Sequence, residues 1–204
     1  MCWAWGDPHI VPFNAPEYDA HALGIRTMAE WADGGMTHSV QLYSCPVVCG
    51  VGNDHWFPCG ASSSVAIAAT VRGTSVVVHG DDVYVNGALV TPALSANGDS
   101  RSVVCPSCSG DKRLTVSRLA DDDPDKRTPG AKVHFTFGND ANAIELSTWR
   151  FNTGHMKTGF LHNARLSVPS DADPSGLCTG ELEYVADSPP DASNGAWQQV
   201  VLDA

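Results

Sequence analysis

Residues 65–90, VAIAATVRGTSVVVHGDDVYVNGALV, carry the clearest secondary-structure signal in this chain. Apolar runs rich in Val and Ala alternate here with short polar turns, at residues 72–73, 80–82 and 86–87. Asn86-Gly87 is a strong hairpin signal, because Asn and Gly accept the positive φ angles of a tight two-residue turn. The stretch therefore predicts consecutive short strands joined by turns.

Similar short runs lie on both sides of this stretch. They are found at residues 10–13, 36–43, 114–119, 132–137, 143–150 and 160–168. Residues 23–31 fit either a strand or a short helix, and residues 44–60 predict a loop because they are rich in Pro, Gly and Cys. Short strands at this spacing predict an all-β chain, an antiparallel β-sandwich with disulfide-bonded loops.

The length of 204 residues suits one hydrophobic core and one domain. Residues 187–195 (DSPPDASNG) have the composition of a linker. We therefore expect a domain over residues 1–186, followed by a linker and C-terminal tail over residues 187–204. Within this tail, residues 197–202 could dock on the domain as an edge strand.

The net charge of the chain limits the classes of partner that it can bind. The formal net charge is −11 and the pI is about 4.9, which argues against nucleic acid and anionic membranes as partners. No apolar run reaches the length of about 18 residues that a membrane span needs, so no membrane insertion is expected. The N-terminus, Met-Cys-Trp, shows no signal peptide, whereas the seven cysteines favour an oxidising compartment, so we expect that a leader or more of a larger protein is missing from this sequence.

Seven cysteines indicate an oxidising compartment, and hence an extracellular or cell-surface location. Five of them form two groups: Cys45, Cys49 and Cys59, and then Cys105 and Cys108. These cysteines, with His55, could form a zinc site. Disulfides are favoured because three residues separate Cys45 from Cys49 and because a Pro-rich loop of a secreted domain more often carries disulfides. Seven is odd, so one cysteine is left free or pairs with another chain.

The stretch Gly6-Asp7-Pro8-His9 has chemistry of its own. The Asp7 carboxyl could attack its own peptide carbonyl, and the tertiary nitrogen of Pro8 leaves more readily than a secondary amide. His9 could supply the proton. Self-cleavage at Asp7, Pro8 and His9 is thus one hypothesis, and a purely structural turn before a strand is the favoured one.

Two motifs together resemble the von Willebrand factor type D domain. The first is Cys2-x3-Gly-Asp-Pro-His with Phe13 four residues after His9, and the second is Gly176-Leu177-Cys178, about a domain length later. The resemblance covers residues 2–185 and implies a strand at residues 23–31. It also implies a disulfide bond between Cys2 and Cys178. In some relatives of this family, Gly-Asp-Pro-His marks self-cleavage between Asp and Pro.

The resemblance also implies calcium as a cofactor, although this chain departs from the family pattern. Asn14 stands where the family has an acidic residue, and Thr179-Gly180 begins the place of an Asn-x-Asp-Gly stretch. Asn14, Glu181, Glu183 and Asp187 could rebuild a calcium site in a shifted register, and the alternative is that these acids are solvated. We expect calcium dependence to be weak or absent.

The resemblance implies an extracellular structural or adhesive module of a fibrous, surface or matrix protein. Its expected partners are other protein chains or copies of itself. The alternatives are a secreted enzyme, since some secreted luciferases carry such domains, a self-cleaving domain, or a secreted ligand-binding module. No nucleophile–base pair stands out in the sequence, so an enzyme is not favoured.

Overall fold

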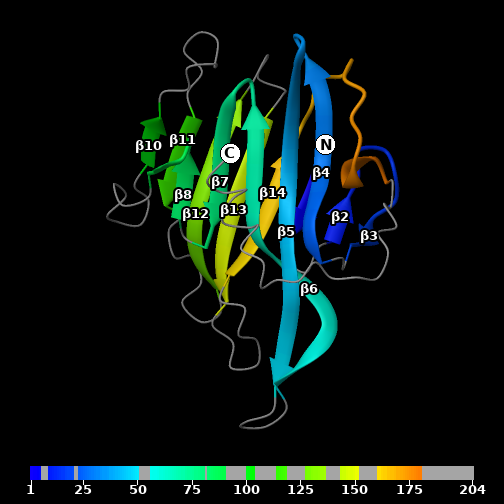
Figure 1. The fold of residues 1–204 in the computed structure, drawn as a ribbon, viewed down its shortest axis with the longest axis vertical. Helices are drawn as coiled ribbons and strands as arrows, with labels where there is room; N and C mark the ends of the chain where they lie inside the picture. Colours follow the sequence, from blue (N-terminus) through cyan, green and yellow to red (C-terminus); the bar gives the residue numbers. More distant parts are fainter. Residues whose placement is uncertain are drawn as a thin grey trace.

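The computed structural model of the chain describes residues 1–5, 9–20, 23–50, 56–80, 82–90, 100–103, 114–118, 127–136, 143–151 and 160–180. These residues form two antiparallel β-sheets (Figure 1). The predicted all-β antiparallel fold is confirmed. In the described part of the chain, no helix is long and apolar enough to cross a membrane. The expected linker and tail at residues 187–204 lie outside the described residues.

The first sheet has eight strands in the order β10-β11-β12-β13-β14-β1-β2-β3. Its strands are β1 (Cys2–Trp5), β2 (His9–Val11), β3 (Tyr18–Asp19), β10 (Ser100–Val103), β11 (Leu114–Arg118), β12 (Arg127–Thr136), β13 (Ala143–Phe151) and β14 (Phe160–Leu166). The N-terminal strand β1 therefore lies between β14 and β2, inside the sheet rather than at its edge.

The second sheet has six strands in sequence order. They are β4 (Gly24–Asp33), β5 (Met36–Gly50), β6 (Trp56–Val71), β7 (Thr74–His79), β8 (Asp82–Val85) and β9 (Ala88–Leu89). Residues 24–33 are thus a strand, as the resemblance implied. The turns at Arg72 and Asn86 have φ angles of 49° and 50°, and the Asn86 side chain accepts a 2.9 Å hydrogen bond from the Ser75 amide. Local turn chemistry therefore builds the hairpins predicted for residues 65–90.

The prediction of a loop over residues 44–60 was wrong. Strands β5 and β6 extend through most of this stretch, and their pairing runs from Ser39–Thr70 to Gly50–Trp56. The pairing tolerates the prolines because its register shifts at two places, one of them next to Pro46. Composition predicted a loop, but pairing between the two arms of one long hairpin outweighs that local preference.

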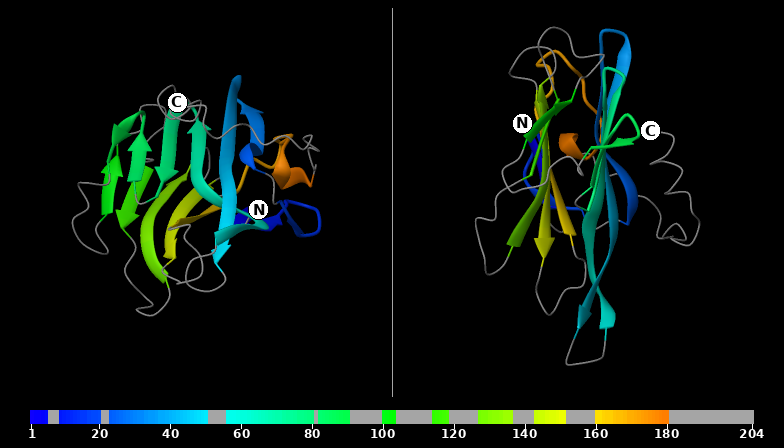
Figure 2. Two further views of the ribbon diagram at one scale, coloured as in Figure 1. Left: turned by 60° about the horizontal axis from the view of Figure 1, so that its bottom comes forward. Right: turned by 90° about the vertical axis from the view of Figure 1, so that its left-hand side faces the viewer.

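The hydrophobic core lies between the two sheets, which form two layers (Figure 2, right). Alternation of side chains sends Ile10, Leu146 and Leu166 inward from the first sheet, and all three are 0–1% exposed. Val40 and Ile67 meet them from the second sheet. Full burial of such a side chain contributes about 1.5–3 kcal/mol each, so these facing rows hold the sandwich together.

Candidate functional site

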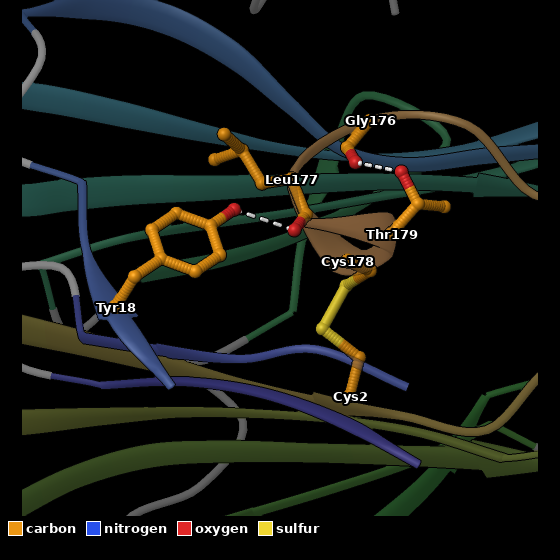
Figure 3. Close-up of a disulfide and its surroundings, with 6 residues drawn as sticks. All are labelled: Cys2, Tyr18, Gly176, Leu177, Cys178 and Thr179. Carbon is orange, nitrogen blue, oxygen red and sulfur yellow. Dashed lines mark hydrogen bonds between the residues drawn. A yellow bond between two sulfur atoms is a disulfide. The ribbon is translucent and has the colours of Figure 1, made fainter. Parts of the chain in front are cut away.

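A disulfide bond joins the start of the described chain to its end. Cys2 of β1 is bonded to Cys178, which lies in a single 3-10 turn, Leu177–Thr179, and the two Cα atoms are 5.6 Å apart (Figure 3). Both cysteines are 0% exposed, and they are separated by 176 positions in the sequence. The pairing implied by the resemblance is thus present in the structure.

The residues around Cys178, here called the closing segment (175–180), connect the two sheets. On one side Ser175 and Glu30 of β4 exchange two backbone hydrogen bonds of 2.9 and 3.0 Å. On the other side the Phe13 amide donates a 2.9 Å hydrogen bond to the Cys178 carbonyl. The closing segment therefore lies between an edge strand of the second sheet and the β2–β3 region of the first (Figure 1).

Gly176 allows the closing segment to approach β4 closely. Its φ angle is 98°, and a Cβ atom placed there would lie 2.7 Å from the carbonyl oxygen of Thr27. A larger residue would be strained by its backbone conformation and would also collide with backbone. Glycine at this place is therefore a requirement of the packing, independent of any family motif.

Tyr18 fixes the closing segment from the first sheet. Its hydroxyl donates a 2.5 Å hydrogen bond to the Leu177 carbonyl (Figure 3). The same carbonyl also accepts a 3.1 Å bond from the Gly180 amide. Burial raises the pKa of Tyr18 to about 12, so the hydroxyl keeps its proton and remains a donor. Tyr18 carries no signal of this contact in the sequence, because 159 positions separate it from Leu177.

We expect Tyr18→Phe to lower the free energy of unfolding by about 1 kcal/mol, the typical net value of one hydrogen bond. The loss stays modest because the Leu177 carbonyl retains the Gly180 amide as a donor. Urea unfolding at pH 7 measures the change. Tyr84→Phe on β8 is the matched control, and an equal loss in both variants would contradict a role for this bond.

Of the other five cysteines, the structure describes the side chain of Cys45 alone. Cys45, placed above among the disulfide cysteines, is free, and this corrects that assignment. It pairs across the hairpin with Ser63, so no cysteine faces it in the ladder. The backbone at Cys49 and Cys59 is in strands β5 and β6, but the structure does not describe their side chains. Cys105 and Cys108 lie outside the described residues altogether. Whether these four form disulfides stays a prediction.

The calcium hypothesis also stays a prediction. Asn14 is exposed after β2, while Glu181, Glu183 and Asp187 lie outside the described residues. Among the residues that are described, no group of three or more His, Cys, Asp or Glu side chains is placed to hold a metal ion.

The possible self-cleavage site is described only at His9. Asp7 and Pro8 lie outside the described residues, and self-cleavage at this bond stays a prediction. The His9 Nδ1 atom lies 2.5 Å from the Asp19 Oδ1 atom of β3. No local sequence pattern indicated Asp19 as a partner of His9.

A buried histidine connects the two sheets through the core. The Nδ1 atom of His162 on β14 donates a 2.8 Å hydrogen bond to the Ser64 carbonyl on β6. The side chain is 1% exposed. Burial lowers the pKa of His162 to about 4, and the Ser64 carbonyl offsets only part of this effect. His162 is therefore neutral at pH 7, and the sequence offered no signal that distinguished it from the other histidines.

In comparisons with known proteins, no family model matches the chain, and no curated protein matches it.

Proposed function

We propose that this chain is an extracellular structural or adhesive module of the von Willebrand D type, acting in assembly within a fibrous, surface or matrix protein. The observation that carries the proposal is the buried Cys2–Cys178 disulfide, which joins β1 to the closing segment. It links the motif before Gly-Asp-Pro-His to the Gly-Leu-Cys motif, the two parts of the sequence on which the resemblance rests.

The disulfide places the two ends of the sandwich side by side. Tension entering at residue 1 passes through Cys2, the two sulfur atoms and Cys178, and leaves towards Gly180. The chain between the two cysteines is not in this path. A module with this connection transmits force through covalent bonds while its β-sheets stay folded, which suits a component of an assembled fibre or matrix.

The burial of the disulfide supports a role outside the cell. Structural disulfides persist in oxidising compartments, whereas cytosolic reductants keep thiols reduced. Both sulfur-bearing side chains are fully covered by the core, so reductants have no direct access while the protein is folded. The net charge of −11 suits partners that are neutral or basic.

The location can be tested in the natural source of the protein. An antibody against the chain is applied to intact cells and to extracellular material, and the recovered protein is mapped without reductant. We expect the protein outside the cell with Cys2 and Cys178 bonded. Protein found only inside cells, with both thiols open to alkylation, would overturn the proposal.

A further inference from the structure

The outer face of the first sheet carries a row of neighbouring aromatic rings that are tilted against one another. Cys2 and Ala4 of β1 point into the core, so Trp3 and Trp5 lie on the opposite, outward face. The ring centroids of Trp3 and Trp5 are 5.5 Å apart, and those of Trp5 and His9 are 5.4 Å apart. Trp3 is 48% exposed, although large aromatic side chains are usually covered. The three rings are here called the aromatic face.

Polar groups flank the aromatic face at both ends. Arg165 of β14 lies opposite Trp3, with its Cζ atom 5.8 Å from the centre of the ring, and the exposed His9–Asp19 pair lies at the other end. Glu145 of β13 is the cross-strand neighbour of Arg165. A few polar groups converging beside aromatic rings are the usual composition of a ligand site.

Groups of opposite charge lie next to each other around the aromatic face. Arg165 is the cross-strand neighbour of Glu145, and His9, which is charged only when protonated, contacts Asp19, so no excess of positive charge remains at this place. The chain as a whole carries −11, which repels polyanions. These charges disfavour an anionic ligand. An uncharged ligand fits if it presents hydrogen-bonding groups to the flanks and places an apolar surface on the rings.

We propose that the aromatic face binds a neutral glycan. The C–H groups on one face of a sugar ring carry partial positive charge, and the faces of Trp3 and Trp5 carry negative charge, so the two attract each other. The equatorial hydroxyls of the sugar would then meet Arg165 at one end and Asp19 at the other. This site goes beyond the proposed structural role and does not depend on where the protein is found.

A protein partner or a second copy fits this face less well. The centre of a stable protein interface is depleted of charged residues and belongs to a contact of about 1,200 Å² or more. Here Arg165 and His9 lie directly beside the tryptophans, so the apolar centre is narrow. The arrangement is that of a small polar ligand site.

The test is titration of the full chain with uncharged hexasaccharides, namely cellohexaose, chitohexaose and mannohexaose, with a heparin hexasaccharide for comparison. Calorimetry and tryptophan fluorescence report binding. We expect at least one neutral sugar to bind and heparin to bind more weakly or not at all. Trp3→Ala and Trp5→Ala should each weaken binding about tenfold or more, since loss of stacking and buried area costs on the order of 1.4 kcal/mol.

Two further variants make the result decisive. Trp3→Phe keeps an aromatic face and should retain most of the affinity, while Leu89→Ala removes an exposed apolar side chain from β9 of the other sheet and should change nothing. Melting temperatures establish that each variant is folded.

Three results would overturn the inference. The first is no binding of any neutral hexasaccharide at about 10 mM, well above the range of specific affinities. The second is binding that survives Trp3→Ala unchanged, and the third is self-association of the chain that Trp3→Ala abolishes. None of these results would bear on the location of the protein or its response to tension.

Discussion

Replacing Cys2 and Cys178 together with alanine is expected to lower the free energy of unfolding by about 5 kcal/mol, because the disulfide closes a loop of 176 positions. The free energy of unfolding of a native protein is only about 5–15 kcal/mol. The variant should therefore lose a large share of its stability or fail to fold at 25 °C. Alanine is chosen because serine would place a hydroxyl at two fully buried positions.

Urea unfolding without reductant measures this loss. The single variant Cys2→Ala should lose nearly as much as the double variant, because either change removes the crosslink. Cys45→Ala is the matched control, since Cys45 is free and takes no part in this bond. A double variant within about 1 kcal/mol of the parent chain, which is the ordinary effect of a point mutation, would contradict the role given to the disulfide.

The second large effect is loss of stability in acid through His162. Its pKa of about 4 in the folded protein lies below the ordinary value of 6.5, so the unfolded chain takes up a proton more readily. The stabilising contribution is complete above pH 6.5 and is lost as the pH falls towards 4. The difference in pKa corresponds to about 3 kcal/mol in total, and to about 2 kcal/mol between pH 7 and pH 5.

His162→Gln separates this effect from other titrations. Glutamine can still donate to the Ser64 carbonyl but takes up no proton in this range, so the variant should lose about 2 kcal/mol less than the parent between pH 7 and pH 5. The comparison variant is His79→Gln, because the charge of the exposed His79 makes a smaller contribution to the lowered pKa of His162 than burial does, and this variant should therefore change the acid sensitivity less than His162→Gln. Identical pH profiles for the parent and His162→Gln would show that His162 does not limit stability in acid.

Sequence patterns predicted the parts of the fold that depend on neighbouring residues. The strands of residues 65–90 follow from Arg72-Gly73 and Asn86-Gly87, whose turn conformations are set within each dipeptide. The same reasoning failed at residues 44–60. There the strands depend on pairing between two segments that are each poor in local strand signals.

The candidate sites were predicted less completely, for a physical reason. The Cys2–Cys178 bond came from a resemblance between motifs, since cysteine spacing alone leaves many connectivities open. The contacts of Tyr18 with Leu177 and of His162 with Ser64 join residues 159 and 98 positions apart, and no local pattern encodes them. The Trp3–Ala4–Trp5 alternation was a readable signal, because period two on a strand places both rings on one face.

The measurement that tests the central claim most directly is stretching of a single chain of 204 residues, held at Met1 and Ala204, in the absence of reductant. We predict that the oxidised chain releases only the residues outside the Cys2–Cys178 loop. In the Cys2→Ala/Cys178→Ala variant the 176 positions inside the loop become extensible, which adds up to ~600 Å of contour length. Release of several hundred ångströms from the oxidised parent chain would show that tension does enter the sandwich, and would contradict the account.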